Sequence, residues 1–330
     1  MSFPLLRLPL LASITVIKNL DVYLIIYLTR ISSSKIRRLV KISKVRIKLT
    51  VYPYDVLFEK IADPGEYLSS PFFLISKRAV TLRKIPFEPI YICDKDWISR
   101  REEGYRRIIN DFNNFFIVQT LQFHLKSASV CYKNLEYAKS IGLQPTTIET
   151  MLIGANEEVY QRILTSCSHV TELRVHLFED FPFDGFSEYT VDDFRLYIPG
   201  QNINWFTVDH MCALINCRSV LVYHINWESE DFNKFLRFWM VSNGRLQSVT
   251  LWGKWSPTPD NLQVLLDKID NRKIIENEKF EVQRVDGVKA HVACGRRGEF
   301  SLKRMKIANP LVRCKSKFLS KMILNSEYLS

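Results

Sequence analysis

The chain has 330 residues, of which 47% are hydrophobic, 12% aromatic and 25% charged. This composition excludes wholesale disorder, and the length is enough for a large core and favours about two domains. The seven cysteines are widely spaced and contain no CxxC pair, unlike the cysteines of a secreted disulfide framework. We therefore expect a protein of a reducing compartment, the cytoplasm or the nucleus.

The net charge of +11 is concentrated at the two ends of the chain. Residues 22–54 contain eight basic and no acidic residues, and residues 296–330 contain nine basic and two acidic ones. Basic flanks of this kind are typical of solvated segments, so nucleic acid is not the expected partner. The apolar N-terminus is interrupted by Lys18 and Asp21 and lacks a signal-peptide cleavage site, so we expect neither a membrane span nor secretion.

Residues 1–45 are predicted to form three short amphipathic helices. Pro9 suits a first helical turn, and the serines at 32–34 offer an N-cap for a helix over residues 35–42. Helices this short form no large core alone, so they should pack against a partner or the following domain.

Residues 46–94 alternate apolar and polar side chains between proline and glycine turns, which indicates a β-rich connecting segment. A longer helix is predicted after it, over residues 96–116.

Residues 95–295 show a loose repeat of three apolar positions, Φ-x-x-Φ-x-Φ. The six matches begin at Val118, Ile148, Val170, Val191, Cys217 and Leu246, with helical segments predicted at 132–140, 157–166, 208–215 and 230–241. Spacings of this size, about 20–30 residues, are typical of leucine-rich repeats. We predict an α/β fold in which a short three-helix N-terminal segment precedes an irregular leucine-rich-repeat-like array. Another α/β layer packing is the alternative. Residues 296–330 are predicted to form a basic C-terminal tail.

The clearest predicted helix follows Ser229, a good N-cap residue. Its apolar residues are spaced at i, i+3, i+4, i+7 and i+8, and are Phe232, Phe235, Leu236, Trp239 and Met240. Gly244 is placed to end the helix in a left-handed conformation. The stripe is typical of a core-facing helix and not of a binding surface.

The sequence contains none of the common catalytic or cofactor motifs. A P-loop, a dinucleotide-binding glycine motif, HExxH and GxSxG are all missing, and the six histidines are not spaced with cysteines or acids as zinc ligands. We therefore expect no catalytic residues, no metal and no cofactor, and a protein that is not an enzyme.

Residues 3–41 read FPLLRLPLLASITVIKNLDVYLIIYLTRISSSKIRRLVK. This segment resembles an F-box, which opens on a Leu-Pro pair, here Leu8-Pro9, and continues through spaced aliphatic residues to a basic helix. Leu11 stands where the F-box pattern often has an acid. The resemblance implies binding to a Skp-family adaptor, and through it to a cullin, by Leu5, Leu6, Leu8, Pro9, Leu10, Leu11, Ile14, Ile17, Leu20, Ile25 and Ile26.

Residues 202–252 are similar to the type-two F-box-associated domain. The matching residues are Trp205, Thr207, Asp209, Asn216, Cys217, Asp231, Asn233, Phe235, Trp239, Arg245 and Leu246. Together the two resemblances imply a substrate-recognition subunit of an SCF-type ubiquitin ligase, whose C-terminal domain holds an unidentified target protein. The alternative is a stand-alone protein- or nucleic-acid-binding scaffold that has lost adaptor binding.

A target-binding face follows if the six repeat segments are neighbouring strands. The residues one past each motif then form a column, which is His124, Gly154, His176, Tyr197, Tyr223 and Trp252. The column two residues earlier is Gln122, Leu152, Arg174, Arg195, Leu221 and Thr250. Because Tyr, Trp and Arg often anchor interfaces, we predict that His124, Arg174, His176, Arg195, Tyr197, Tyr223 and Trp252 contact the target. A register error of one residue would instead turn these side chains into the core.

Overall fold

The computed structural model describes most of the chain. The described residues are 8–20, 24–25, 28, 33–51, 56–61, 72–75, 106, 109–110, 112–125, 128–151, 157–176, 183–197, 205–270, 272–276, 278–295 and 298–305. Most of the predicted 46–94 segment, the start of the predicted 96–116 helix and the C-terminal tail beyond residue 305 lie outside them. Among the described residues no helix is long and apolar enough to cross a membrane.

The described strands form one mixed sheet of 13 strands, in the order β10-β11-β12-β13-β9-β8-β7-β6-β5-β4-β1-β2-β3. The parallel strands are β1 (Arg46–Val51), β4 (Ile117–Leu125), β5 (Thr147–Met151), β6 (Glu172–His176), β7 (Asp193–Tyr197), β8 (Ser219–Ile225) and β9 (Ser248–Gly253). Antiparallel strands extend both ends: β2 (Val56–Lys60), β3 (Phe72–Ile75), β10 (Arg272–Glu276), β11 (Lys279–Gln283), β12 (Lys289–Gly295) and β13 (Glu299–Arg304).

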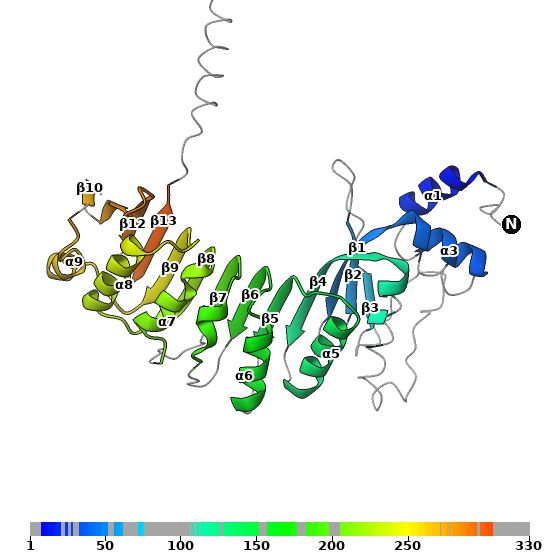
Figure 1. The fold of residues 1–330 in the computed structure, drawn as a ribbon, viewed down its shortest axis with the longest axis horizontal. Coiled ribbons are helices and arrows are strands. Elements are labelled where there is room, and N and C mark those ends of the chain that lie inside the picture. The colour runs from blue at the N-terminus through cyan, green and yellow to red at the C-terminus, as the bar shows by residue number, and fades with distance from the viewer. Residues whose placement is uncertain are drawn as a thin grey trace, which may run out of the picture.

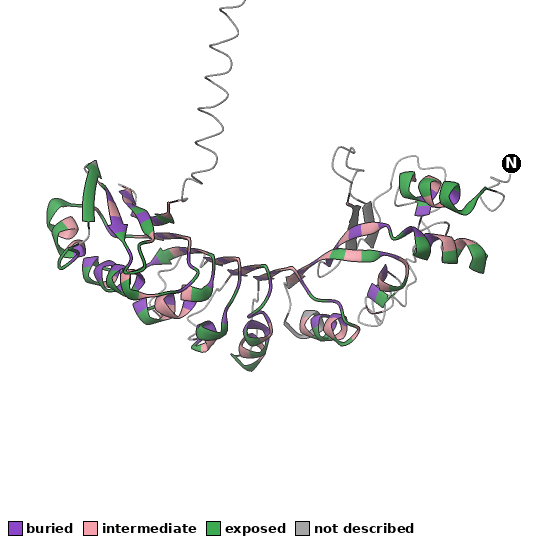
Figure 2. Cartoon of the chain, turned by 45° about the horizontal axis from the view of Figure 1, so that its top comes forward, coloured by how far each residue is buried: buried purple, intermediate pink, exposed green. Residues whose placement is uncertain are grey.

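The helices lie along one face of the sheet. They are α5 (Ala128–Ser140), α6 (Glu157–Ser166), α7 (Val208–Ala213), α8 (Ser229–Val241) and α9 (Pro259–Leu265), with short 3-10 helices η3 (Gly185–Glu188) and η4 (Leu214–Asn216). Figures 1 and 2 show that the sheet curves into an arc, with α5 to α8 on its convex side. The concave face carries no helix among the described residues. At the end of the arc nearest β1 lie α1 (Leu10–Asn19) and α3 (Ser34–Ser43).

The core lies between the sheet and the helices. One buried residue of each central strand stands in register with its neighbours: Phe123, Ile148, Leu173, Phe194, Val220 and Val249. These residues are 21 to 29 positions apart in the sequence, so strand-containing units of that length stack side by side, and each contacts mainly its neighbours. The predicted α/β alternation is confirmed.

The helix α8 confirms the predicted stripe, because Phe232, Phe235, Leu236 and Trp239 are all buried. Its ends differ from the prediction. Glu228, not Ser229, is the N-cap, because its backbone N–H donates to Asp231 Oδ2 at 3.1 Å in a capping box.

Gly244 does not end α8 in a left-handed conformation, because Ser242 already caps the helix with extended backbone. A Cβ at position 244 would lie 2.6 Å from the carbonyl oxygen of Ile215, so the glycine permits a close backbone approach.

The last strand, β13, lies beside β9 although 45 residues separate them. Gly298 precedes β13 at a φ of 78°, and its carbonyl accepts the backbone N–H of Gly253 at 3.0 Å. A Cβ here would lie 2.0 Å from the Gly253 oxygen. Only glycine fits this junction, which closes the parallel array with an antiparallel strand.

Candidate functional site

The concave face is built by strand alternation. In β6 and β7 buried residues alternate with half-buried ones, and the half-buried side chains point away from the helices. Three rows of side chains cross the strands on this face, and most of these side chains are half-buried. We call them the hydroxyl row, the charged row and the aromatic row.

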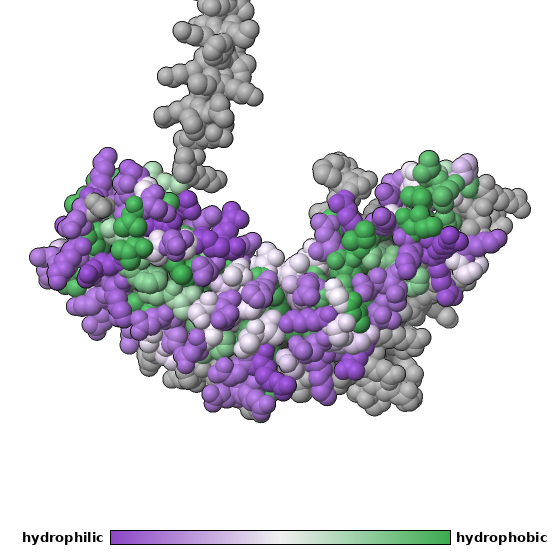
Figure 3. Space-filling model, in the orientation of Figure 1, coloured by the Kyte–Doolittle hydropathy of each residue, from purple (hydrophilic) through white to green (hydrophobic). Residues whose placement is uncertain are grey.

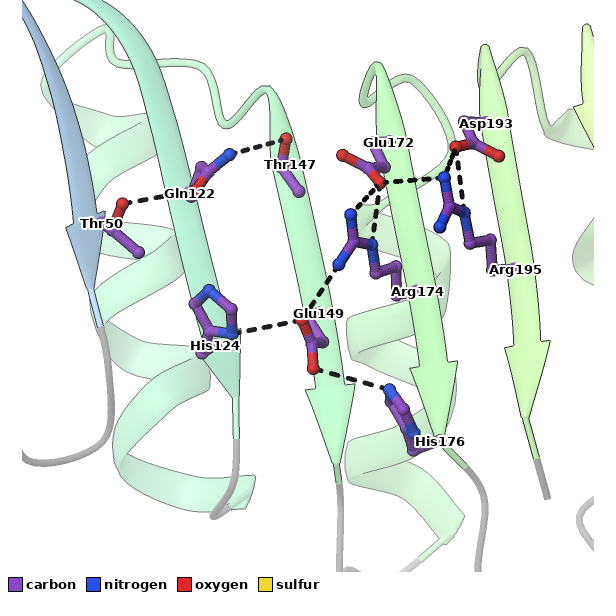
Figure 4. Close-up of polar contacts among 10 residues, drawn as sticks. All are labelled: Thr50, Gln122, His124, Thr147, Glu149, Glu172, Arg174, His176, Asp193 and Arg195. Atoms are coloured by element: carbon purple, nitrogen blue, oxygen red, sulfur yellow. Dashed lines mark hydrogen bonds and ion pairs between the residues drawn. The ribbon is translucent and has the colours of Figure 1, made fainter. Parts of the chain in front are cut away.

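The hydroxyl row begins on β1 and is held by side-chain hydrogen bonds between strands. Thr50 Oγ1 donates to Gln122 Oε1 at 3.3 Å, and Gln122 Nε2 donates to Thr147 Oγ1 at 3.5 Å (Figure 4). The same register continues through Glu172, Asp193, Ser219 and Ser248.

The charged row consists of His124, Glu149, Arg174 and Arg195, which stand in register on β4 to β7. Arg174 donates through Nε and Nη2 to one oxygen of Glu172, at 2.8 and 2.5 Å, and its Nη1 lies 3.7 Å from Glu149. Arg195 binds Asp193 in the same way, at 3.0 and 2.5 Å. Figure 4 shows one continuous network in which the carboxylates and guanidinium groups alternate.

Glu149 lies between two histidines. Its two carboxylate oxygens are 3.3 Å from His124 Nδ1 and 3.5 Å from His176 Nε2. Hydrogen bonds from His124 and His176 hold the pKa of this carboxyl well below its usual range, although partial burial opposes the shift. The carboxylate therefore stays ionised, and the network neutralises most of its own charge.

The aromatic row consists of His176, Tyr197, Tyr223 and Trp252, which are all half-buried. The rings are nearly parallel: His176 and Tyr197 have centroids 4.8 Å apart, Tyr197 and Tyr223 also 4.8 Å, and Tyr223 and Trp252 6.2 Å. Neighbouring rings cover one another's faces, so the row offers mainly ring edges and polar tips on the concave side. Such a surface suits contact with another polypeptide, because tyrosine and tryptophan supply large contact area with few rotatable bonds.

The predicted column is correct for four residues and wrong for His124. His124 pairs with Glu149, and Glu149 pairs with Arg174, so His124 belongs to the charged row and not beside His176. The predicted motif was shifted on β5 because Thr150 occupies a buried position that the pattern expected to be apolar. Gly154 and Leu152, which the shifted motif had placed in the columns, lie outside the described residues. Glu149, the centre of the network, was missed; the alternation of Thr147, Ile148, Glu149 and Thr150 was the signal for it.

A second surface lies at the start of α1 and in the residues just before it. Leu8, Leu10 and Leu11 have exposed fractions of 37%, 55% and 78%, and Figure 3 shows apolar side chains gathered over this helix. We call these three leucines the N-terminal apolar patch. Pro9 is exposed beside them, while Ile14 and Leu20 are half-buried.

Two of the predicted adaptor contacts face inward. Ile17 and Ile25 are fully buried in the protein's own core, so their side chains are not exposed to a partner in this structure. Leu5, Leu6 and Ile26 lie outside the described residues. On α3 the residues Lys35, Arg37, Arg38 and Lys41 are exposed, which gives this helix a positively charged surface.

The residues that carried the F-box-associated resemblance lie mostly on the helix side of the sheet. Asn233 Nδ2 donates to the carbonyls of Leu265 and Asp267, at 2.9 and 2.7 Å, and so joins α8 to the end of α9. Asp209 binds Lys234 at 2.9 Å between α7 and α8, and Arg245 Nη2 donates to the carbonyl of Thr190 at 2.7 Å. Phe235, Trp239, Cys217 and Leu246 are buried. These residues hold the layers together and do not reach the concave face.

The described residues give little support for a reactive cysteine or a metal site. Burial raises the pKa of Cys167, Cys217 and Cys294 to about 12, so these thiols are unreactive near neutral pH. Within the described ranges there is no group of three or more His, Cys, Asp or Glu residues that could hold a metal ion.

Comparison with known proteins agrees with this part of the fold. Residues 188–251 match a family model described as F-box associated. A curated relative, the Skn-1 dependent zygotic transcript 15 protein of Caenorhabditis elegans, is 27% identical over 222 residues, which are 61% of this chain and 63% of the relative. The chain thus covers a little under two thirds of the length of that relative. No solved structure matches the chain. The segment from the end of η3 to β9 therefore carries an F-box associated domain.

Proposed function

We propose that this protein is the substrate-recognition subunit of an SCF-type ubiquitin ligase. The match of residues 188–251 to the F-box associated family carries the proposal, because it occurs in a chain whose N-terminus exposes an apolar patch that includes the leucine of a Leu-Pro pair. In this proposal the stacked strand and helix units form an irregular leucine-rich-repeat-like array. The protein would work in the cytoplasm, the nucleus or both.

The two surfaces take different partners. The N-terminal apolar patch, which lies at one end of the arc, binds a Skp-family adaptor that joins the protein to a cullin (Figure 1). The concave face holds the target protein. Three exposed leucines at the start of one short helix, Leu8 before it and Leu10 and Leu11 on it, form an apolar surface that supports a partner at this end.

The adaptor proposal is tested with the variant Leu10→Ala, Leu11→Ala, produced together with a Skp-family adaptor. Truncation of buried interface anchors commonly costs more than 1 kcal/mol each, so the affinity should fall roughly tenfold or more. Neither side chain supports the core, and the melting temperature of the double variant should stay close to that of the native chain.

Val285→Ala is the matched control, since Val285 is 75% exposed and belongs to the turn that follows β11. It should leave adaptor affinity unchanged. Equal adaptor affinity of the native chain and the double variant, or no binding by either, would contradict adaptor binding through this patch.

The exposed basic residues of α3 favour a second candidate, a scaffold that binds nucleic acid through this end. The two candidates differ in salt dependence, because phosphate contacts release counterions and affinity then falls steeply with salt. Binding of single-stranded RNA or duplex DNA of random sequence that disappears in Lys35→Ala, Arg38→Ala, together with no adaptor binding, would favour the scaffold.

A further inference from the structure

The strand β10 ends the sheet at the opposite end from α1. It pairs on one side with β11, with Arg272 opposite Val282 and Ile274 opposite Phe280, and the sheet order places no described strand on its other side. The backbone N–H and C=O groups along an edge of this kind are a template for another strand.

The apolar exposure of this edge is unusual for a strand that ends a sheet. Ile274 and Ile275 have exposed fractions of 68% and 46%. Ile275 lies at the register shift between Ile274 and Glu276, so β10 presents two adjacent isoleucines to water at an irregular point of the strand. Figure 2 shows β10 as an exposed strand that stands apart from the buried sheet.

The sequence of β10 is complementary to itself in the antiparallel direction. The strand reads RKIIE, with two basic residues at its start and an acidic residue at its end. If two copies pair about a twofold axis through Ile274, the two Ile274 residues meet. Arg272 of each strand then lies opposite Glu276 of the other, and Lys273 lies opposite Ile275. Opposite charges across a strand pair stabilise it, whereas like charges do the reverse. A parallel pairing in register would instead put the basic starts together.

We propose that a second copy of this chain pairs with β10, antiparallel and centred on Ile274, to form a twofold dimer with a continuous sheet. A closed twofold contact uses the same patch on both copies, which is what a self-complementary strand supplies. Because β10 and the N-terminal apolar patch lie at opposite ends of the arc, the dimer would leave both adaptor-binding ends and both concave faces free (Figure 1). The proposal does not depend on the proposed ligase function.

Two features of β10 also suit a protected edge of a monomer. Lys273 lies within the strand, and the β10–β11 register shifts between Ile274 and Glu276. Lysines and bulges of this kind protect natural edges from pairing. The experiment must therefore be able to show that the protein is a monomer.

The test is sedimentation velocity of the full-length native chain over a range of concentrations up to tens of micromolar. We expect a reversible monomer–dimer equilibrium, and Ile274→Lys should weaken it at least tenfold because it brings two like charges together at the twofold axis. Val285→Lys is the matched control, since it adds the same charge at an exposed valine outside β10 and should leave the equilibrium unchanged. A native chain that is monomeric throughout, or a dimer that Ile274→Lys does not weaken, overturns the proposal.

A charge exchange tests the register. Arg272→Glu and Glu276→Arg should each weaken the dimer, and the variant that carries both should recover it. In the monomer, Arg272 Nη1 donates to the carbonyl of Leu266, and the double variant cannot restore that bond. Recovery would therefore come from pairing between copies. A double variant as weak as the single ones would exclude the antiparallel register.

Discussion

The two faces of the sheet use the same strands for different purposes. On the convex face, buried side chains such as Phe194 and Val220 pack against helices that the F-box-associated residues hold in place. On the concave face, the charged and aromatic rows are half-buried and are satisfied mostly by one another. The side chains on the convex face therefore determine the fold. Substitutions on the concave face should change the stability of the fold much less. This division suits a protein that presents a variable surface on a fixed scaffold.

The largest expected effect is on the convex face. Trp239 is fully buried on α8, and its ring lies under the guanidinium of Arg284 at 5.8 Å. Trp239→Ala should destabilise the fold by about 3–5 kcal/mol because it leaves a large cavity. Chemical denaturation of the soluble fraction measures this loss. A variant with unchanged stability that had lost only partner binding would reverse the roles of the two faces.

An intermediate effect is expected in the aromatic row. Tyr223 stacks between Tyr197 and Trp252, so Tyr223→Ala removes the middle of the stack. We expect roughly 1 kcal/mol of lost stability and at least a tenfold loss of target proteins retained from a cell extract, measured by quantitative mass spectrometry. Thr120→Ala, on β4 and outside the three rows, serves as the control. The same set of retained proteins for all three chains would show that the aromatic row does not bind the target.

The smallest expected effect concerns pH. The folded-state pKa of Glu149 is lowered by His124 and His176, so its ionised form stabilises the fold at pH values above its unfolded pKa of about 4.3. The contribution is lost as the pH falls below that value. Glu149→Gln should therefore cost about 1 kcal/mol or less near pH 6, and the difference from the native chain should shrink below pH 4. Thermal melts across this range measure it; a difference that is constant with pH would mean that the carboxylate charge is not what matters.

Sequence alone predicted the elements whose residues follow a regular period. The helix α6 was predicted with its exact bounds, and the α8 stripe was correct because four large apolar residues occupy one helix face. Register was harder, since it depends on pairing between strands. Thr150 is buried where an apolar residue was expected, so the β5 motif was placed wrongly. On β4 the third motif position, Phe123, pairs through Ile148 with Leu173, the second position on β6, so His124 was assigned to the wrong row. Ile17 and Ile25 show the same limit: their apolar character indicated burial, but only the packing shows that the chain itself buries them.

The position of β13 has a consequence for synthesis of the chain. The units from β5 to β9 pair with strands that leave the ribosome one after another, so each can form soon after it is made. The strand β1 must wait for β4, and β9 must wait for β13, which lies beyond residues 254–298. A nascent chain that has not yet reached residue 299 therefore leaves the edge of β9 unpaired. During that interval the edge of β9 is open to wrong pairing, and it is covered only once β13 has been made.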